Sequence, residues 1–167
     1  MHKSILIFGA SKGLGRASAE HFAKNGWEVF AVARDKTLLD DLQKITGSIN
    51  VKTCDVTIES DVADAFSWAV AKSQIDAVLL TAGGGFTTDL PLENTGAESL
   101  RQAFEVNAIG TFFVAVHVKN LFSSQKRGVF VGIGSRASLN QDVLPGRVAY
   151  SASKHAQLAV IETLHGE

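Results

Sequence analysis

The chain has 167 residues, of which 46% are apolar and 20% are charged, and its formal net charge is −1. This length fits one domain with its own core, and this balance is typical of a globular protein rather than a disordered one. Sixteen basic residues are offset by seventeen acidic ones, and no basic run is present, so we expect no nucleic-acid partner. Cys54 is the single cysteine, which excludes an internal disulfide and a cysteine-based metal cluster, and we expect no metal site.

The first apolar run, Ser4–Phe8, bears on where the protein resides. It is too short for a signal peptide or a membrane span, so we expect no membrane partner. A single cysteine also suits a reducing compartment, and we therefore expect a cytoplasmic protein.

Apolar segments that fit strands alternate with segments that fit helices along the whole chain. We predict strands at 3–8, 28–33, 50–54, 76–81 and 128–133. We predict helices at about 13–25, 35–44, 59–72 and 97–122, and a last helix that begins near Tyr150. Continuous apolar strands that alternate with helices favour a parallel sheet covered on both faces. We therefore predict a single doubly wound, Rossmann-like α/β domain over residues 1–167.

Two of the predicted helices have informative apolar patterns. In 35–44, Leu38, Leu39 and Leu42 fall on one face, which we expect to be buried. In 97–122, apolar residues occupy more than one face, so we expect this helix to be covered on two sides.

A glycine-rich turn joins the first predicted strand to the first helix, with the spacing G-x-x-x-G-x-G. Unpaired N–H groups at a helix start, together with the helix dipole, favour a negatively charged ligand. Glycine allows a tight turn and lets a pyrophosphate touch the backbone. Taken alone, the motif is weak and also fits an ordinary strand-to-helix turn. The residues that we assign to a phosphate cradle are Gly9, Ser11, Lys12, Gly13, Leu14 and Gly15.

Arg34 comes directly after the second strand, which in a dinucleotide fold ends beside the adenosine ribose. An acidic residue there would accept a hydrogen bond from a free 2′-hydroxyl, whereas Arg34 and Lys12 favour a 2′-phosphate. Each of the two cations also fits a solvated surface residue. Asp35 fits the N-cap of the next helix better than a cofactor contact. The charges therefore favour NADP(H) over NAD(H).

Short polar or small segments follow the third and fourth strands. After the third strand come Asp55 and Val56; the Asp55 carboxylate fits a contact to the adenine amino group or, equally, a cap or turn. After the fourth strand, Ala82 and Gly83 open a loop that runs through Gly84, Gly85 and Phe86. Small residues let a flat ligand lie against the backbone, although a simple flexible loop is the alternative.

Tyr150 and Lys154 are four residues apart at the start of the last predicted helix, which places them on one face. A nearby ammonium favours the phenolate form of a tyrosine, so the pair fits a general acid–base for carbonyl or alcohol chemistry. A surface helix pair is the alternative. Ser135 follows the fifth strand at the edge that carries the glycine turn, where its hydroxyl fits either a substrate contact or a turn or cap.

Together these motifs resemble the classical short-chain dehydrogenase/reductase family. The matching residues, in order and approximate spacing, are Gly9-x-x-x-Gly13-x-Gly15, Asp55, Ala82-Gly83, Asn107, Ser135 and Tyr150-x-x-x-Lys154. The resemblance covers essentially the whole chain. It implies the strand order 3-2-1-4-5 and an NADP(H)-dependent oxidoreductase that acts on a carbonyl or alcohol substrate.

The resemblance also implies roles for individual residues. Tyr150 would be the catalytic acid–base, and Lys154 would support it and bind the nicotinamide ribose, so that both also contact the cofactor. Ser135 would orient the substrate oxygen. Asn107 would sit at a break in the long helix and hold a water of a proton relay; a buried polar residue that satisfies backbone groups is the alternative. The family often dimerises through the long helix and the helix of Tyr150, so we expect a homodimer or homotetramer.

Several positions depart from the family pattern. Phe8 stands where the family usually has Thr, and Leu80-Thr81 replaces two polar residues that brace the loop; Thr81 could compensate in part. The interval from Ser135 to Tyr150 is longer than usual, and Ser138 is the alternative substrate-orienting serine.

Family members continue with further helix, two more strands and a substrate-covering segment. We therefore expect either a truncated form or a fifth strand whose exposed edge is covered by a partner subunit. The sequence leaves two alternatives to an enzyme, which are a dinucleotide-binding module without turnover and a structural subunit.

Overall fold

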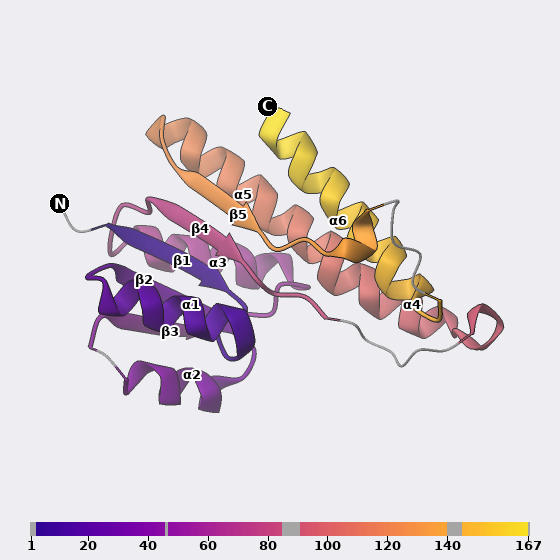
Figure 1. Ribbon diagram of the computed structural model, residues 1–167. Helices are drawn as coiled ribbons and strands as arrows, with labels where there is room; N and C mark the ends of the chain where they lie inside the picture. The colour runs from indigo at the N-terminus through magenta and orange to yellow at the C-terminus, as the bar shows by residue number, and fades with distance from the viewer. Residues whose placement is uncertain (1–2, 46, 85–90, 140–144, 167) are drawn as a thin grey trace.

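The computed structural model describes residues 3–45, 47–84, 91–139 and 145–166. Five parallel strands form one sheet in the predicted order β3-β2-β1-β4-β5 (Figure 1). They are β1 (Ser4–Phe8), β2 (Glu28–Ala33), β3 (Ile49–Thr53), β4 (Ala77–Leu80) and β5 (Val129–Gly132). The strand order reverses at β1, because β2 and β3 lie on one side of it and β4 and β5 on the other. Ligands of such sheets bind at the carboxyl ends of the strands beside this reversal.

Helices cover both faces of the sheet (Figure 1). They are α1 (Gly13–Lys24), α2 (Lys36–Gln43), α3 (Glu59–Val70), α4 (Ala97–Phe104), α5 (Gly110–Gln125) and α6 (Val148–Gly166). Short 3₁₀ turns η1 (Leu92–Asn94) and η3 (Arg136–Ser138) and a π-helical turn η2 (Glu105–Ile109) complete the described elements. None of the helices in these ranges has the length and apolar character to cross a membrane.

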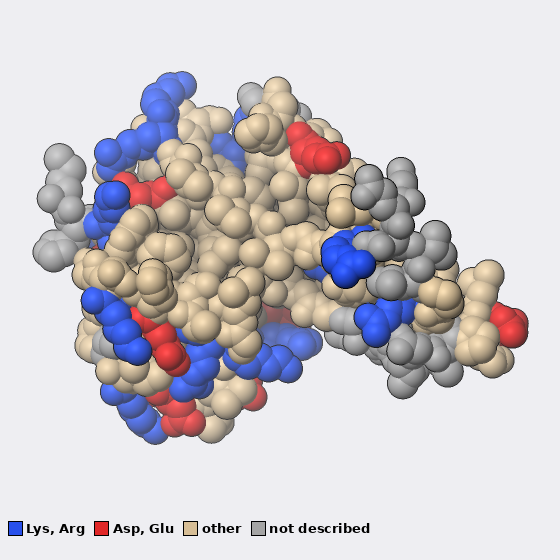
Figure 2. Space-filling model, in the orientation of Figure 1, with Lys and Arg blue, Asp and Glu red and all other residues tan. Residues whose placement is uncertain are grey.

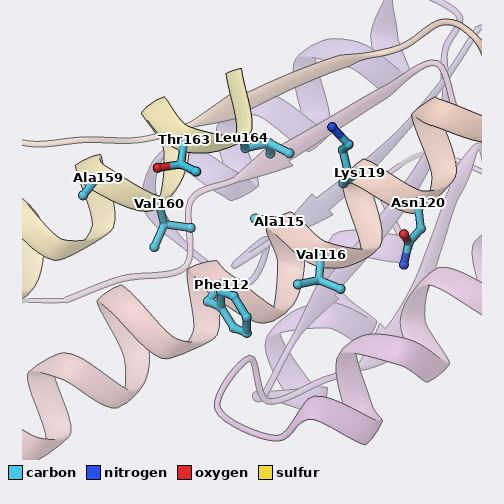
Figure 3. A pocket seen from close by; sticks show the side chains of 9 residues that line it. All are labelled: Phe112, Ala115, Val116, Lys119, Asn120, Ala159, Val160, Thr163 and Leu164. Carbon is cyan, nitrogen blue, oxygen red and sulfur yellow. The ribbon is translucent and has the colours of Figure 1, made fainter. Parts of the chain in front are cut away.

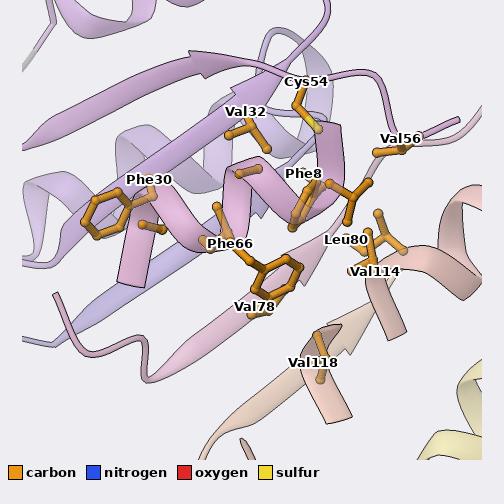
Figure 4. Packing of buried hydrophobic residues seen from close by; sticks show 14 of the residues in the cluster. Phe8, Phe30, Val32, Cys54, Val56, Phe66, Val78, Leu80, Val114 and Val118 are labelled. Carbon is orange, nitrogen blue, oxygen red and sulfur yellow. The ribbon is translucent and has the colours of Figure 1, made fainter. Parts of the chain in front are cut away.

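Alternate residues of the central strand β1 face two separate apolar clusters. On β1, Leu6 and Phe8 face the cluster covered by α3 and α5 (Figure 4). Ile5 and Ile7 face the opposite cluster, which α1 and α2 cover. Both faces of β1 are therefore buried, which explains why its sequence is apolar at successive positions. Full burial of one such side chain contributes about 1.5–3 kcal/mol.

The predicted elements differ from the observed ones mainly in the second half of the chain. The predicted helix 97–122 is interrupted by the π-helical turn η2, so that it comprises α4, η2 and α5. The last helix begins at Val148, two residues before Tyr150, and the short turn η3 precedes it. Predicted strand ends agree with the structure to within one or two residues.

The expectation that the long helix is covered on two sides holds only in part for α5 within the described structure, because α5 packs against α3 and β4 and also against α6 but leaves apolar side chains exposed. Val114 and Val118 are buried against the sheet and α3, but Phe112 is 53% exposed and Val116 is 38% exposed. These two side chains line a groove of about 450 Å³ between α5 and α6, shown in Figure 3. One apolar side of α5 is therefore open.

The surface carries charges of both signs. In the view of Figure 2, basic and acidic side chains are interspersed over the region of α1 and α2, and the centre of this face is largely uncharged. On the described part of this face, neither sign forms a continuous patch.

Candidate functional site

A cavity of about 710 Å³ opens at the carboxyl ends of β1 to β4. Its size suits a ligand as large as a dinucleotide better than a small ion. Apart from Tyr150 and Lys154, every residue predicted to contact a cofactor lines it. These residues are Gly9, Ser11, Lys12, Gly13, Leu14, Gly15, Arg34, Asp55, Val56, Ala82 and Gly83.

The glycine turn is held between β2 and β4. The N–H groups of Gly9 and Ala10 both donate to the carbonyl of Val32, at 2.8 and 3.1 Å. Gly9 has a φ of +89°, and a Cβ built on it would lie 2.6 Å from the Ala82 nitrogen, so only glycine fits here. The Thr81 hydroxyl donates to the carbonyl of Phe8 at 2.8 Å. Thr81 thus braces the turn from β4.

The start of α1 has the features of an anion site. Its N-cap residue, Lys12, makes no side-chain capping bond, and the first turn contains no acidic residue. The N–H groups of that turn therefore have no side-chain acceptor at the cap, and they face a cavity that the exposed Lys12 also lines. Unpaired N–H groups, the helix dipole and an ammonium all favour a phosphate at this position.

Arg34, Asp35 and Asp55 form the corner of the cavity at the ends of β2 and β3. The Asp35 carboxylate accepts a bond from the Leu38 N–H at 3.0 Å, so the predicted N-cap of α2 is confirmed. Asp55 Oδ1 accepts bonds from the N–H and hydroxyl of Thr57 at 3.0 and 2.9 Å, which gives it a turn role. Arg34 is 65% exposed, and its Nη1 lies 3.9 Å from Asp55 Oδ2. Such a long, exposed ion pair is weak, so the guanidinium keeps most of its attraction for another anion.

Several residues that line the cavity were not predicted to do so, including Leu38, Cys54, Thr81 and Val106. Leu38 was expected on the buried face of α2, but it is only partly buried and faces the cavity, whereas Leu39 and Leu42 are buried. Its place five residues after the end of β2 is the signal that could have found it. Burial, with Asp61 and Asp55 nearby, raises the pKa of the Cys54 thiol to about 12, so it is no nucleophile at neutral pH.

Asn107 is fully buried in the π-helical turn η2, at the predicted break in the long helix. Its amide exchanges two bonds with the backbone of Gly84, at 3.1 and 3.0 Å, and donates a third to the Ser153 hydroxyl at 3.0 Å. The side chain thus ties the loop after β4 to α6. Asn107 therefore satisfies backbone groups, which was the alternative to a role in catalysis. Its role in a proton relay stays a prediction.

Tyr150 and Lys154 lie on one face of the first turns of α6. The Lys154 ammonium is 5.9 Å from the centre of the Tyr150 ring. Lys154 is 5% exposed, and burial lowers the pKa of its ammonium. A Cβ built on Gly83 would lie only 3.4 Å from this ammonium, so Lys154 adjoins the loop that closes the cavity.

The two candidate serines have different surroundings. The Ser135 hydroxyl accepts a bond from the Ala137 N–H at 3.1 Å and so caps η3, while the side chain stays partly exposed. Its own hydrogen is still available to a substrate oxygen. Ser138 is buried, and its hydroxyl donates to the Ser135 carbonyl at 2.6 Å. The geometry therefore favours Ser135 as the serine that faces a ligand.

Comparison with known proteins decides the family. The model for short chain dehydrogenases matches residues 3–167. The chain belongs to this short-chain dehydrogenase family. The chain is 30% identical over 169 residues to short chain aldehyde dehydrogenase 1 of Euphorbia lathyris, covering 99% of this chain and 58% of that protein. It is 30% identical over 174 residues to farnesol dehydrogenase of Aedes aegypti, covering 99% of this chain and 70% of that protein.

Solved structures agree with the fold of this short-chain dehydrogenase. The structure of ElxO with NADP bound has a TM-score of 0.88 and 25% identity, covering 96% of this chain and 65% of that one. The chain thus spans about three fifths to seven tenths of the length of these three proteins.

Gln157 is a further polar residue at the site that the motifs did not indicate. It is 1% exposed on α6, one turn after Lys154, to which it is hydrogen-bonded. A glutamine among small and apolar neighbours on the buried face of a helix is the signal that could have found it. Within the described ranges, no three His, Cys, Asp or Glu side chains are grouped so as to hold a metal ion.

Proposed function

We propose that this short-chain dehydrogenase binds NADP(H) in the cavity at the strand ends and interconverts a carbonyl and an alcohol. One observation carries the proposal: a single cavity has Lys12 and Arg34 among its lining residues and reaches the loop of Gly83, which adjoins the buried Lys154. The phosphates of a dinucleotide need cations such as Lys12 and Arg34. Acid–base chemistry at a nicotinamide needs a group such as Lys154 near the same cavity.

The residues present fit this cofactor. The close approach of Gly9 to Ala82 leaves backbone, without side chains, where a pyrophosphate would lie. Arg34 and Lys12 would hold the 2′-phosphate, and Asp55 and Val56 would flank the adenine. Bound NADPH would supply the hydride for reduction.

The remaining steps belong to the chain's own groups. Tyr150 would give a proton to the substrate oxygen in reduction and take it back in oxidation. The Lys154 ammonium would favour the phenolate of Tyr150 and bind the nicotinamide ribose. Ser135 would donate a hydrogen bond to the substrate oxygen and fix its position. Asn107 would hold the loop after β4 and the relay water.

The test combines binding with turnover. We expect NADPH fluorescence to change on mixing with the protein and NADPH to be consumed with members of a carbonyl panel. Tyr150→Phe should lower kcat at least about 100-fold, the usual loss when a general acid is removed, while NADPH still binds. Binding without turnover in the wild-type chain would support a dinucleotide-binding module instead. An absence of NADPH binding would overturn the proposal.

We also propose a homodimer or homotetramer located in the cytoplasm. The open apolar side of α5 and the groove that it shares with α6 support self-association (Figure 3). The single thiol of Cys54, which is free and buried, suits a reducing compartment.

A further inference from the structure

A buried hydrogen-bonded chain connects Lys154 to the π-helical turn. Lys154 Nζ donates to Gln157 Oε1 at 2.6 Å, and Gln157 Nε2 donates to the Thr111 hydroxyl at 3.0 Å. That hydroxyl donates in turn to the carbonyl of Asn107 at 2.7 Å. Gln157 and Thr111 are 1% and 0% exposed, so water does not compete for these bonds.

The chemistry of the groups fixes the direction of this chain. An ammonium has donors only, so the end of the Gln157 amide that meets Lys154 must be the oxygen. The other end is then the NH₂ group, which needs an acceptor. The Thr111 hydroxyl accepts there because its own hydrogen is engaged by the Asn107 carbonyl. The amide is therefore held in one orientation with its oxygen aimed at the ammonium.

When Tyr150 is protonated, the described groups in contact with the Lys154 ammonium carry no formal charge. Its second acceptor is the carbonyl of Ile133 at 3.1 Å. Thr111 of α5 and the Gly83 loop approach from the other packed elements, and Tyr150 is the titratable side chain in contact, on the preceding turn of α6. A neutral anchor fixes the position of a cation without cancelling its charge, which a carboxylate would do.

From this geometry we propose that Gln157 is a positioning residue that holds the Lys154 ammonium beside Tyr150 through a neutral amide anchored by Thr111. Its consequence for turnover rests on the proposed function. Its effect on Lys154 itself does not, because the position and titration of the ammonium are measurable without substrate or cofactor.

The first measurement follows the titration of Lys154 by NMR of the chain labelled with ¹³C at lysine Cε, with Lys154→Met to identify the signal. Burial already lowers the pKa of Lys154. Gln157→Leu removes an acceptor and should lower this pKa further, by about 1 pH unit, the loss expected for one charge-assisted bond. Gln157→Glu places a carboxylate there and should raise it by at least as much. Unchanged titration in both variants, or shifts of the same sign, would overturn the proposal.

Two further variants separate positioning from general destabilisation. Thr111→Val keeps the side-chain volume but removes the anchor of the Gln157 amide, and it should lower the Lys154 pKa in the same direction as Gln157→Leu, by less. Gln125→Leu removes a glutamine that donates to the Ile75 carbonyl at 2.9 Å, far from Lys154 in the fold, and should leave the titration unchanged. If Gln157→Leu does not fold, the opposite shifts expected for Gln157→Glu and Thr111→Val still decide the question. Shifts of the same sign in these two variants, or no shift in either, would contradict it.

The second measurement is the pH profile of NADPH-dependent turnover. If the charged form of Lys154 is needed, kcat falls as pH rises through its pKa. That alkaline limb should move to lower pH in Gln157→Leu, with kcat lowered about tenfold, and to higher pH in Gln157→Glu, where kcat is partly restored. Absence of turnover in the wild type would remove the proposed function but leave the NMR test of the Lys154 anchor intact. If the alkaline limb of the kcat profile lies at the same pH in the wild type and all variants, the role of Gln157 in turnover is contradicted.

Discussion

Arg34 is the residue on which the proposed preference for NADP(H) over NAD(H) mainly rests. Its side chain is 65% exposed, and its ion pair with Asp55 is long at 3.9 Å. An exposed pair of this kind contributes little, so the guanidinium has more to gain from a bidentate contact with a 2′-phosphate. A 2′-hydroxyl offers no comparable charge.

Arg34→Ala should therefore weaken NADPH binding about tenfold or more and change NADH binding little, because the lost bond is charge-assisted only with the phosphate. Fluorescence titration of both cofactors checks this. Arg101→Ala is the control, since Arg101 is a similarly exposed arginine of α4, 3.8 Å from Glu98. Equal losses for NADPH and NADH would refute the role of Arg34.

Cys54 gives a second prediction at this scale, because its thiol changes stability at alkaline pH. Its pKa is raised from 9.0 to about 12 on folding. The unfolded chain therefore releases the thiol proton at a lower pH than the folded chain does. The contribution of the protonated thiol to the free energy of unfolding is complete below pH 9 and is lost as pH rises toward 12. Between pH 8 and 10.5 this group should remove about 2 kcal/mol from the free energy of unfolding.

Urea unfolding at the two pH values checks the prediction. Cys54→Ala should be less stable at pH 8 but should lose about 2 kcal/mol less than the wild type on going to pH 10.5. Other groups titrate in both proteins, so the comparison isolates the thiol. Identical losses in the two proteins would contradict the prediction.

At the scale of elements, the π-helical turn η2 places a polar side chain of the long helix at the candidate site. It presents Asn107 to the backbone of Gly84 and to Ser153, which belong to the loop after β4 and to α6. Three elements are therefore joined by one buried amide. The cost of an irregular turn is offset by bonds that a regular helix would not place there, and such turns often mark functional sites.

Asn107→Ala should lower the free energy of unfolding by about 2–4 kcal/mol, because it leaves the Gly84 backbone groups and the Ser153 hydroxyl without this partner. Chemical denaturation measures the loss. The matched control is Asn120→Ala, an exposed asparagine of α5, which should change stability by less than about 0.5 kcal/mol. Similar losses in the two variants would show that the buried hydrogen bonds of Asn107 do not add to the free energy of unfolding.

At the scale of the whole molecule, two exposed apolar features stand apart from the cavity. One is the groove between α5 and α6, with Phe112 53% exposed. The other is the edge strand β5, where Val129 and Val131 are 59% and 46% exposed. The edge position of β5 agrees with the prediction, and whether the chain is a truncated form stays a prediction.

The two features predict different assemblies. If copies associate through the helices, light scattering should give at least twice the 17.8 kDa of one chain, and Phe112→Asp should reduce the mass to one chain by burying an unpaired charge. Val129→Asp at the edge strand is the control and should leave the mass unchanged. Loss of assembly in Val129→Asp alone would place the contact at β5 instead.

The strand order was implied by the resemblance to the family. The sequence by itself determined the five strands and the glycine turn that lines the cavity. These features are local: a strand buried on both faces must be apolar throughout, and a glycine that approaches backbone cannot be replaced. Tertiary structure alone decided which side of α5 stays open, where Leu38 faces, and that Gln157 meets Thr111, 46 residues away in the chain. Contacts between such distant residues depend on how helices pack, and periodicity within one helix does not specify its neighbours.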